Sequence, residues 1–334
     1  MRSAPATVLL SCFACTALLA QDTDPFFAGR AQMALDPSRT GFDAGARITL
    51  LHNDQWLQIP GSWSSDLLLG ELCARNTKKT TTAWMGLGLL ATHERQGVAE
   101  SRTASVGLAP AMHVRAGRRS FLSAGLEARW MNGTYGDGSG QWGSQYDGVR
   151  YDAALPSGES SSSGSASWIE ARIGLSVTVK QDAESPRRRE RNVLEAGIAA
   201  DHLGRLRLSE GGTLPQEAPI RLSGYVLGEL PYAPWDDGFF AAELIAHAQG
   251  PFRTGRFNVY AGKHLLNRVR QENGPAQIGF KAGLGYRLQD ALLVNAAIDL
   301  RKATIGLAYG WSVFNRNPMA AGRRTFELFV QMRI

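Results

Sequence analysis

Hydrophobic and polar residues alternate along much of the chain after residue 42. In four clear windows of about 9 to 12 residues each, every second position holds an uncharged residue. These windows are 122–130, 169–179, 278–288 and 326–334. The positions between them carry eight charged residues: Glu127, Arg129, Glu170, Arg172, Lys281, Arg287, Glu327 and Arg333. Because successive side chains of a strand point to opposite faces, each window predicts a strand with one apolar and one polar face.

The length of these strands indicates what covers the apolar face. Strands in soluble sheets usually have about 5 to 6 residues, whereas a tilted strand that crosses a bilayer needs about 9 to 11. Lipid offers no hydrogen bonds, so such a sheet has to close on itself. Aromatic residues near the segment ends, Trp84, Trp130, Trp168, Tyr286 and Trp311, fit an interfacial girdle. We therefore predict a transmembrane antiparallel up-and-down β-barrel.

The pattern predicts fourteen strands, at 43–51, 63–71, 82–92, 101–113, 120–130, 168–179, 193–201, 220–230, 239–248, 256–264, 277–288, 291–300, 303–313 and 324–334. An even number places both termini on one side, which is the periplasm in bacterial barrels. The longest connections, 131–167 and 202–219, then lie outside. The first is rich in Gly and Ser and fits either a surface loop or a lid or partner-docking loop. The turn at 181–192 is long for the periplasmic side.

The N-terminus has the features of a secretory signal peptide at 1–20. Arg2 is followed by an apolar run over 6–19, and cleavage after Ala20 would leave Gln21 first. Cys12 and Cys15 leave a lipoprotein signal as the alternative. We expect residues 21–42 to form an N-terminal periplasmic arm and residues 43–334 to form the barrel. Phe26 and Phe27 would dock this arm into the barrel or onto a periplasmic partner.

Composition and charge exclude several other classes. Hydrophobic residues make up 44% of the chain, but no later stretch approaches the roughly 20 apolar residues of a membrane helix. The net charge is +6, or +5 once Arg2 is removed. The dense basic runs, at 118–119 and 187–189, lack interleaved aromatic residues and fit solvated turns better than a nucleic-acid surface.

Little in the sequence points to bond chemistry. The spacing of Gly138, Gly140 and Gly143 matches a dinucleotide-binding fingerprint. The sequence around them does not predict the strand-turn-helix that this motif requires, so we do not assign a cofactor site. The six histidines are scattered, without the spacing of a metal pair. Cys73 is the one cysteine left after removal of the signal peptide. It is either a reactive thiol or, as is more common for a lone cysteine, an inert one. We predict no catalytic, cofactor-binding or metal-binding residues, and no enzyme.

The polar face of the strands predicts a charged inner wall. We place Glu127, Arg129, Glu170, Arg172, Lys281 and Arg287 in the lumen. Ion pairs such as Glu127 with Arg129 would fill a narrow lumen or, alternatively, tune a channel. The glycines at 279, 283 and 285 leave room for bulky neighbours or permit bends in the barrel.

Several short motifs, in order along the whole mature chain, resemble the PorP/SprF family of type IX secretion system membrane proteins. The motif positions are Asp24, Pro25, Phe26, Asp36, Pro37, Gln55, Trp56, His202, Gly285, Tyr286, Arg287, Phe326 and Glu327. Family members open with Asp-Pro-x-Phe and then an Asn-Pro-Ala element. Here Asp36 replaces the Asn and Ser38 the Ala, and the usual Pro after His202-Leu203 is missing.

This resemblance implies an outer-membrane component of the secretion apparatus of Bacteroidota, which exports surface adhesins, gliding-motility proteins and secreted enzymes. Its partners would be outer-membrane lipid, periplasmic ring and peptidoglycan-linked proteins, the translocon, and cargo with C-terminal sorting domains. It would link cargo or translocon to the periplasmic machinery without bond chemistry. The alternative is an outer-membrane porin or hydrophobic-solute transporter. Nothing in the sequence supports a third class, a lipase or protease.

Overall fold

The computed structural model describes residues 24–43, 45–57, 61–74, 82–97, 101–135, 143–146, 149–156, 164–181, 191–208, 218–232, 238–266, 277–300, 302–313 and 323–334. The predicted signal peptide and its cysteines lie outside these residues, as do Gly138, Gly140 and the basic run 187–189. None of the described helices is long and apolar enough to cross a membrane.

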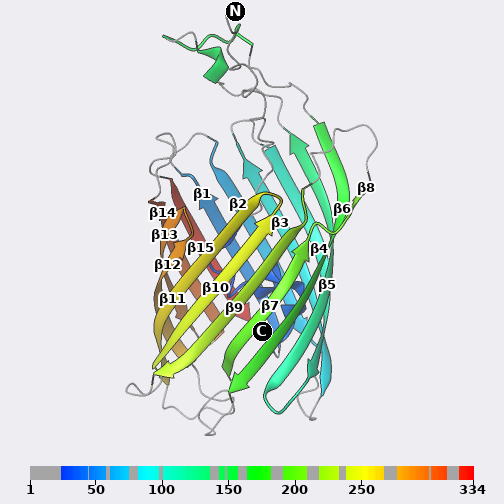
Figure 1. Ribbon diagram of the computed structural model, residues 1–334, viewed down its shortest axis with the longest axis vertical. Helices are drawn as coiled ribbons and strands as arrows, with labels where there is room; N and C mark the ends of the chain where they lie inside the picture. Colours follow the sequence, from blue (N-terminus) through cyan, green and yellow to red (C-terminus); the bar gives the residue numbers. More distant parts are fainter. Residues whose placement is uncertain are drawn as a thin grey trace, which may run out of the picture.

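Within the described residues, fourteen long antiparallel strands close into a barrel (Figure 1). They are β1 (Ala46–Gln55), β2 (Trp63–Cys73), β3 (Ala83–Gln96), β4 (Ser101–Arg115), β5 (Ser120–Tyr135), β6 (Gly164–Gln181), β7 (Arg191–Asp201), β9 (Arg221–Tyr232), β10 (Gly238–Gln249), β11 (Phe252–Leu266), β12 (Gln277–Arg287), β13 (Ala291–Asp299), β14 (Ala303–Ser312) and β15 (Arg324–Arg333). Each strand pairs with its neighbours in the chain, and β1 pairs with β15 to close the sheet. The predicted fold class is confirmed.

Alternating burial along each strand follows the alternation in the sequence. In β13, for example, successive residues are buried and exposed in strict order, with Leu292, Val294 and Ile298 exposed and Asn295 buried. Large apolar side chains of this kind are exposed around the outside of the barrel, while charged and amide side chains are buried inside it. This arrangement puts a hydrophobic surface towards lipid and a polar surface towards the lumen.

The two ends of the barrel are distinct. We call the end with the connections 136–163 and 202–220 the loop end, and the end where β1 begins and β15 finishes the terminal end. The connection after β5 is shorter than predicted because β5 and β6 extend further towards the loop end. It contains the short helix η2 (Gly143–Gln145), which lies above the barrel in Figure 1.

The strand predicted at 220–230 is preceded by an unpredicted short strand, β8 (Arg205–Arg207), which pairs with β6. His202 and Gly204 adopt positive φ angles of 59° and 82°, and this break separates β8 from β7. The bend therefore redirects the chain at the loop end, within the predicted connection at 202–219.

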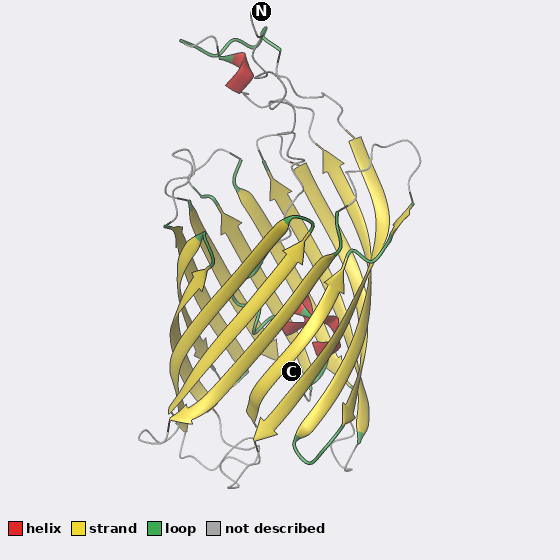
Figure 2. Ribbon diagram, viewed as in Figure 1, coloured by secondary structure: helices red, strands yellow, loops and turns green. Residues whose placement is uncertain are grey.

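Residues 24–42 lie inside the barrel, and we call them the lumen segment. The segment contains two short helices, α1 (Gln32–Leu35) and η1 (Pro37–Arg39), which Figure 2 shows within the ring of strands. Phe26, Phe27 and Met33 are all at most 2% exposed. We expected a periplasmic arm at 21–42 that Phe26 and Phe27 would dock into the barrel or onto a periplasmic partner. Residues 24–42 lie in the lumen with both rings buried there, as in the first alternative, because the wall offers partners for their apolar and polar groups.

Two other expectations need correction. The first strand starts at Ala46 and not at residue 43, because the chain is still leaving the lumen there and turns at Gly45 with a φ of 94°. Trp130 and Trp311 are exposed outside as expected of a girdle, but Trp84 and Trp168 are each only 3% exposed and face inward. The Trp84 ring packs with Phe42, and Cys73 lies against this cluster.

Candidate functional site

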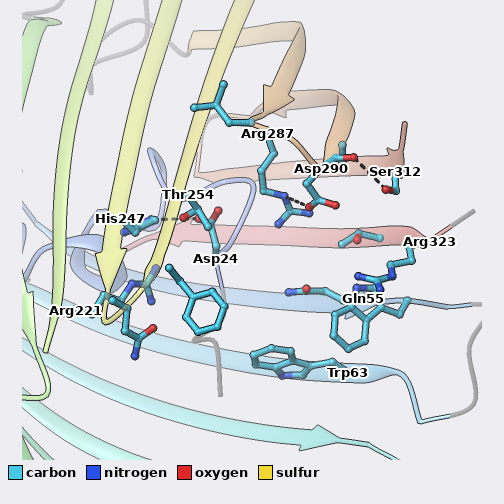
Figure 3. Close-up of a pocket in the computed structure, with 16 residues that line it drawn as sticks. Asp24, Gln55, Trp63, Arg221, His247, Thr254, Arg287, Asp290, Ser312 and Arg323 are labelled. Atoms are coloured by element: carbon cyan, nitrogen blue, oxygen red, sulfur yellow. Dashed lines mark hydrogen bonds and ion pairs between the residues drawn. The ribbon is translucent and has the colours of Figure 1, made fainter. Parts of the chain in front are cut away.

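The lumen segment begins near the loop end, where Asp24 is held by cations of the wall. Its carboxylate lies 3.1 Å from the Arg256 guanidinium. It also lies 3.5 Å from His247 Nε2, and Figure 3 shows Asp24 beside this histidine. Burial alone would raise the pKa of Asp24, but the charge of Arg256 lowers this pKa well below its usual range. Asp24 is therefore ionised and fixed to β10 and β11.

Glu327 of β15 anchors the next two residues through their backbone. Its two carboxylate oxygens accept hydrogen bonds from the N–H groups of Phe26 and Phe27, both at 2.7 Å, and Asn53 donates a third at 2.8 Å. The carboxylate is fully buried. The Phe27 ring stacks on Phe329 at 5.3 Å. A buried carboxylate that accepts from two backbone donors, which would otherwise stay unpaired, makes a specific attachment.

The Asp36-Pro37 turn is fixed to the opposite wall. Asp36 accepts hydrogen bonds from the Tyr225 hydroxyl of β9 and from the N–H of Ser38, both at 2.8 Å, and so caps η1. Pro37 occupies the first position of this helix, where a missing N–H costs nothing. The Ser38 and Ser176 hydroxyls are 2.7 Å apart, which ties the turn to β6.

Further polar contacts hold the segment where it approaches the terminal end. Arg39 is fully buried, forms an ion pair with Glu195 at 2.9 Å and donates to Thr178. The Gly41 N–H donates to Glu71 at 3.0 Å. The Thr40 carbonyl oxygen lies 2.9 Å from His113 Nε2. The lumen segment is thus attached to the wall along its whole length.

Glycines on the inner wall make room for this segment. A Cβ atom at Gly86 would lie 1.9 Å from the Thr40 carbonyl oxygen, and one at Gly125 would lie 2.3 Å from that of Pro37. At Gly174 it would lie 1.8 Å from a carboxylate oxygen of Asp36. Real side chains never approach so closely, so only glycine fits where the backbones meet.

The predicted lumen charges lie on the inner wall and form ion pairs. Glu127 pairs with Arg129 at 2.6 Å and with Arg172 at 3.0 Å. Arg172 also donates to the Ala34 carbonyl oxygen of the lumen segment at 2.9 Å. Glu170 pairs with His202 at 2.7 Å and accepts from the Trp168 indole at 2.6 Å. These charges pair with one another along the wall, and Arg172 joins them to the segment.

Lys281 and Arg287 lie on β12. The Lys281 ammonium lies 4.1 Å from the Tyr260 ring centroid, and Arg287 pairs with Asp290 at 2.7 Å and lies 5.3 Å from the Phe26 ring. As predicted from the sequence, glycines near them leave room for large neighbours. A Cβ at Gly283 would meet Tyr260 at 2.4 Å, and one at Gly285 would meet Asn258 at 2.0 Å.

Most of the motif positions come together at the lumen segment, although they are spread along the chain. Asp24, Pro25, Phe26, Asp36 and Pro37 belong to the segment itself. Of the remaining positions, Glu327 and Arg287 contact the segment, and Gln55 and Trp56 line a cavity beside Asp24.

The other four motif positions lie elsewhere, and Gly285 faces Asn258 on the inner wall. Tyr286 and Phe326 alternate with inward residues and face the outside, and His202 marks the break before β8. Sequence reasoning missed Arg256, Tyr225 and the glycines that receive the segment. Glycines at polar-face positions were the available signal.

The match to a family model decides the identity of the chain. The model of "Type IX secretion system membrane protein PorP/SprF" matches residues 22–332. The chain belongs to the PorP/SprF family. Membership and the barrel fold place this PorP/SprF protein in the outer membrane, and they indicate a secretion or channel component.

Comparisons with solved structures give lower similarity. The PorP/SprF chain resembles the "TodX deltaS2S3 mutant monoaromatic hydrocarbon channel" with a TM-score of 0.47 and 11% identity, covering 92% of this chain and 95% of that one. It resembles a FadL homologue of Pseudomonas aeruginosa with a TM-score of 0.45 and 10% identity, covering 89% and 92%. No curated protein matches the sequence. Among the described residues, no three His, Cys, Asp or Glu side chains are grouped as a metal site requires.

Proposed function

We propose that this protein links sorting-domain cargo or the translocon in the outer membrane to the periplasmic machinery, by binding alone. The observation that carries this proposal is the filled lumen. Residues 24–42 are held at Glu327, Tyr225 and Glu195 by buried polar contacts, so the barrel has the character of a closed scaffold. Family membership supplies the secretion context.

The two ends offer different surfaces for such a role. With both chain ends of the barrel in the periplasm, as in bacterial barrels generally, the terminal end faces the ring and peptidoglycan-linked proteins. A cavity of about 550 Å³ there is lined by charges of both signs, including Arg47, Lys180, Glu229 and Asp299. The loop end faces the outside and the cargo.

Deleting the gene tests the secretion role directly. We expect export of a protein with a C-terminal sorting domain to stop, and gliding or adhesin display to fail with it, while uptake of small solutes stays intact. Immunoblots of medium and cells measure the export, and complementation with the intact gene is the control. Unchanged secretion in the deletion strain contradicts the proposal.

The second candidate is a porin or hydrophobic-solute transporter. Cavities of about 250 Å³ and 550 Å³, one at each end of the barrel, favour it. We expect the purified full-length protein to be silent in planar bilayers, because the lumen segment separates the two cavities. A steady open-channel current from the unmodified protein would favour the transporter instead.

A further inference from the structure

A cavity of about 250 Å³ lies at the loop end of the barrel, bounded on its inner side by Asp24 (Figure 3). Its wall comes from strand ends far apart in the chain, and Figure 3 shows Arg287 and Asp290 on one side with Gln55 and Trp63 opposite. Three aromatic rings and an aliphatic side chain contribute the apolar surface: Trp56, Trp63, Phe252 and Leu288.

Several hydrogen-bond donors of this wall lack an acceptor. The indole Nε1 of Trp63, the amide Nε2 of Gln249 and the guanidinium Nε of Arg323 are buried and have no hydrogen-bond partner among the described residues. Trp63 and Gln249 are only 6% and 8% exposed. Leaving buried donors unpaired costs free energy, so these groups fit a ligand that supplies acceptor oxygens.

The charges indicate the sign of that ligand. The two carboxylates that line the cavity are already paired, Asp24 with Arg256 at 3.1 Å and Asp290 with Arg287 at 2.7 Å. Arg323 lies 5.1 Å from the ring centroid of Trp56, and no ion pair of Arg323 is formed within the described part of the chain. Its guanidinium is therefore available to a carboxylate of the ligand.

We propose that this cavity binds an organic carboxylate whose flat or apolar body packs against the tryptophans. Arg323 pairs with the carboxylate, and Trp63 and Gln249 donate to its oxygens. The carboxylate belongs either to a small free acid or to an acidic residue of a peptide, since both present the same group. This inference does not depend on the secretion role.

Calorimetric titration of the full-length protein in a neutral detergent tests the proposal. Benzoate is the probe, and benzamide is its uncharged match. We expect saturable benzoate binding, and benzamide binding weaker by about tenfold or more, because a charge-assisted pair is lost. Arg323→Gln is expected to weaken benzoate binding by about tenfold, and Trp63→Phe, which removes the indole N–H together with part of the ring, by roughly fivefold.

Arg253→Gln is the matched control, because the exposed Arg253 side chain, at the loop end of β11, does not line the cavity and, among the described residues, donates only to the backbone carbonyl oxygens of Gly250 and Phe252. It should leave benzoate binding unchanged. Heat-modifiable gel migration shows that each variant is folded, and Trp63→Phe keeps the test decisive if Arg323→Gln fails to fold. Equal binding of benzoate and benzamide, or equal losses in Arg253→Gln and Arg323→Gln, overturns the proposal.

A blocked tripeptide with a central glutamate, and its glutamine counterpart, distinguish the two sources of the carboxylate. Preference for the glutamate peptide over both benzoate and the glutamine peptide supports a peptide ligand. Binding of benzoate alone supports a free acid. If neither benzoate nor the glutamate peptide binds, the cavity is not a carboxylate site.

Discussion

The Glu327→Gln variant is expected to loosen the lumen segment and to give a leaky barrel. Glutamine keeps the shape of the side chain but replaces one acceptor oxygen with an NH₂ group, which then faces the N–H of Phe26 or Phe27. Leaving a buried backbone donor without its acceptor costs about 1 to 3 kcal/mol. Urea unfolding in lipid vesicles should show this loss of unfolding free energy.

The same variant should also conduct. Where the intact protein is silent in planar bilayers, we expect transient channel openings, because the first residues of the segment leave the wall more often. Asp66→Asn is the matched control, because it also replaces a carboxylate with an amide but at an exposed site. Asp66 pairs there with His52. It should change stability by less than about 0.5 kcal/mol and leave conductance unchanged. Equal behaviour of the two variants would show that Glu327 does not anchor the segment.

The strands could be predicted from the sequence because their determinant is local. Alternation is a property of neighbouring residues, and windows such as 122–130 carry it clearly, so β5 begins where expected. The ends of the strands depend on more than this local pattern. β1 continues through His52 and Asp54, whose side chains are polar on the outer face, because its backbone still pairs with β2 and β15 there.

The position of the lumen segment has no such local signature. Phe26 and Phe27 are recognised by Glu327, about 300 residues away, and the segment has no regular period. The inward position of Trp84 could not be predicted for the same reason, because an aromatic residue at the end of a strand can lie on either face. Its parity with Gly86 and Gly88 was the usable signal, since Met85 and Leu87 are exposed on the other face.

The inner glycines connect the sequence to the filled lumen. A porin wall that faces water has no need for glycine at successive inward positions. Here a Cβ at Gly86, Gly88, Gly125 or Gly174 would come within 3 Å of the lumen segment. The glycines on the polar face are therefore typical of a wall packed against protein. The charged residues of the inner wall fit a channel as well as a scaffold, so the charges alone did not distinguish the two.

The Gly86→Ala variant is the sharpest test of this packing, because its added methyl group would meet a backbone oxygen that cannot rotate away. We expect the free energy of unfolding to fall by about 1 to 3 kcal/mol, the usual cost of overpacking. Gly125→Ala should behave similarly. Gly70→Ala is the control, since nothing lies within 4 Å of its Cβ position, and alanine should there raise stability by about 0.5 kcal/mol.

Deleting residues 24–42 completes the comparison, because it removes the oxygen atoms that the new methyl groups would meet. In that background, Gly86→Ala and Gly125→Ala should lose their cost and become as favourable as Gly70→Ala, as measured by urea unfolding in vesicles. The difference between the two backgrounds then gives the coupling between wall and segment. If the alanine variants stay equally destabilised without the segment, the inner glycines serve the curvature of the sheet and not the packing of the lumen.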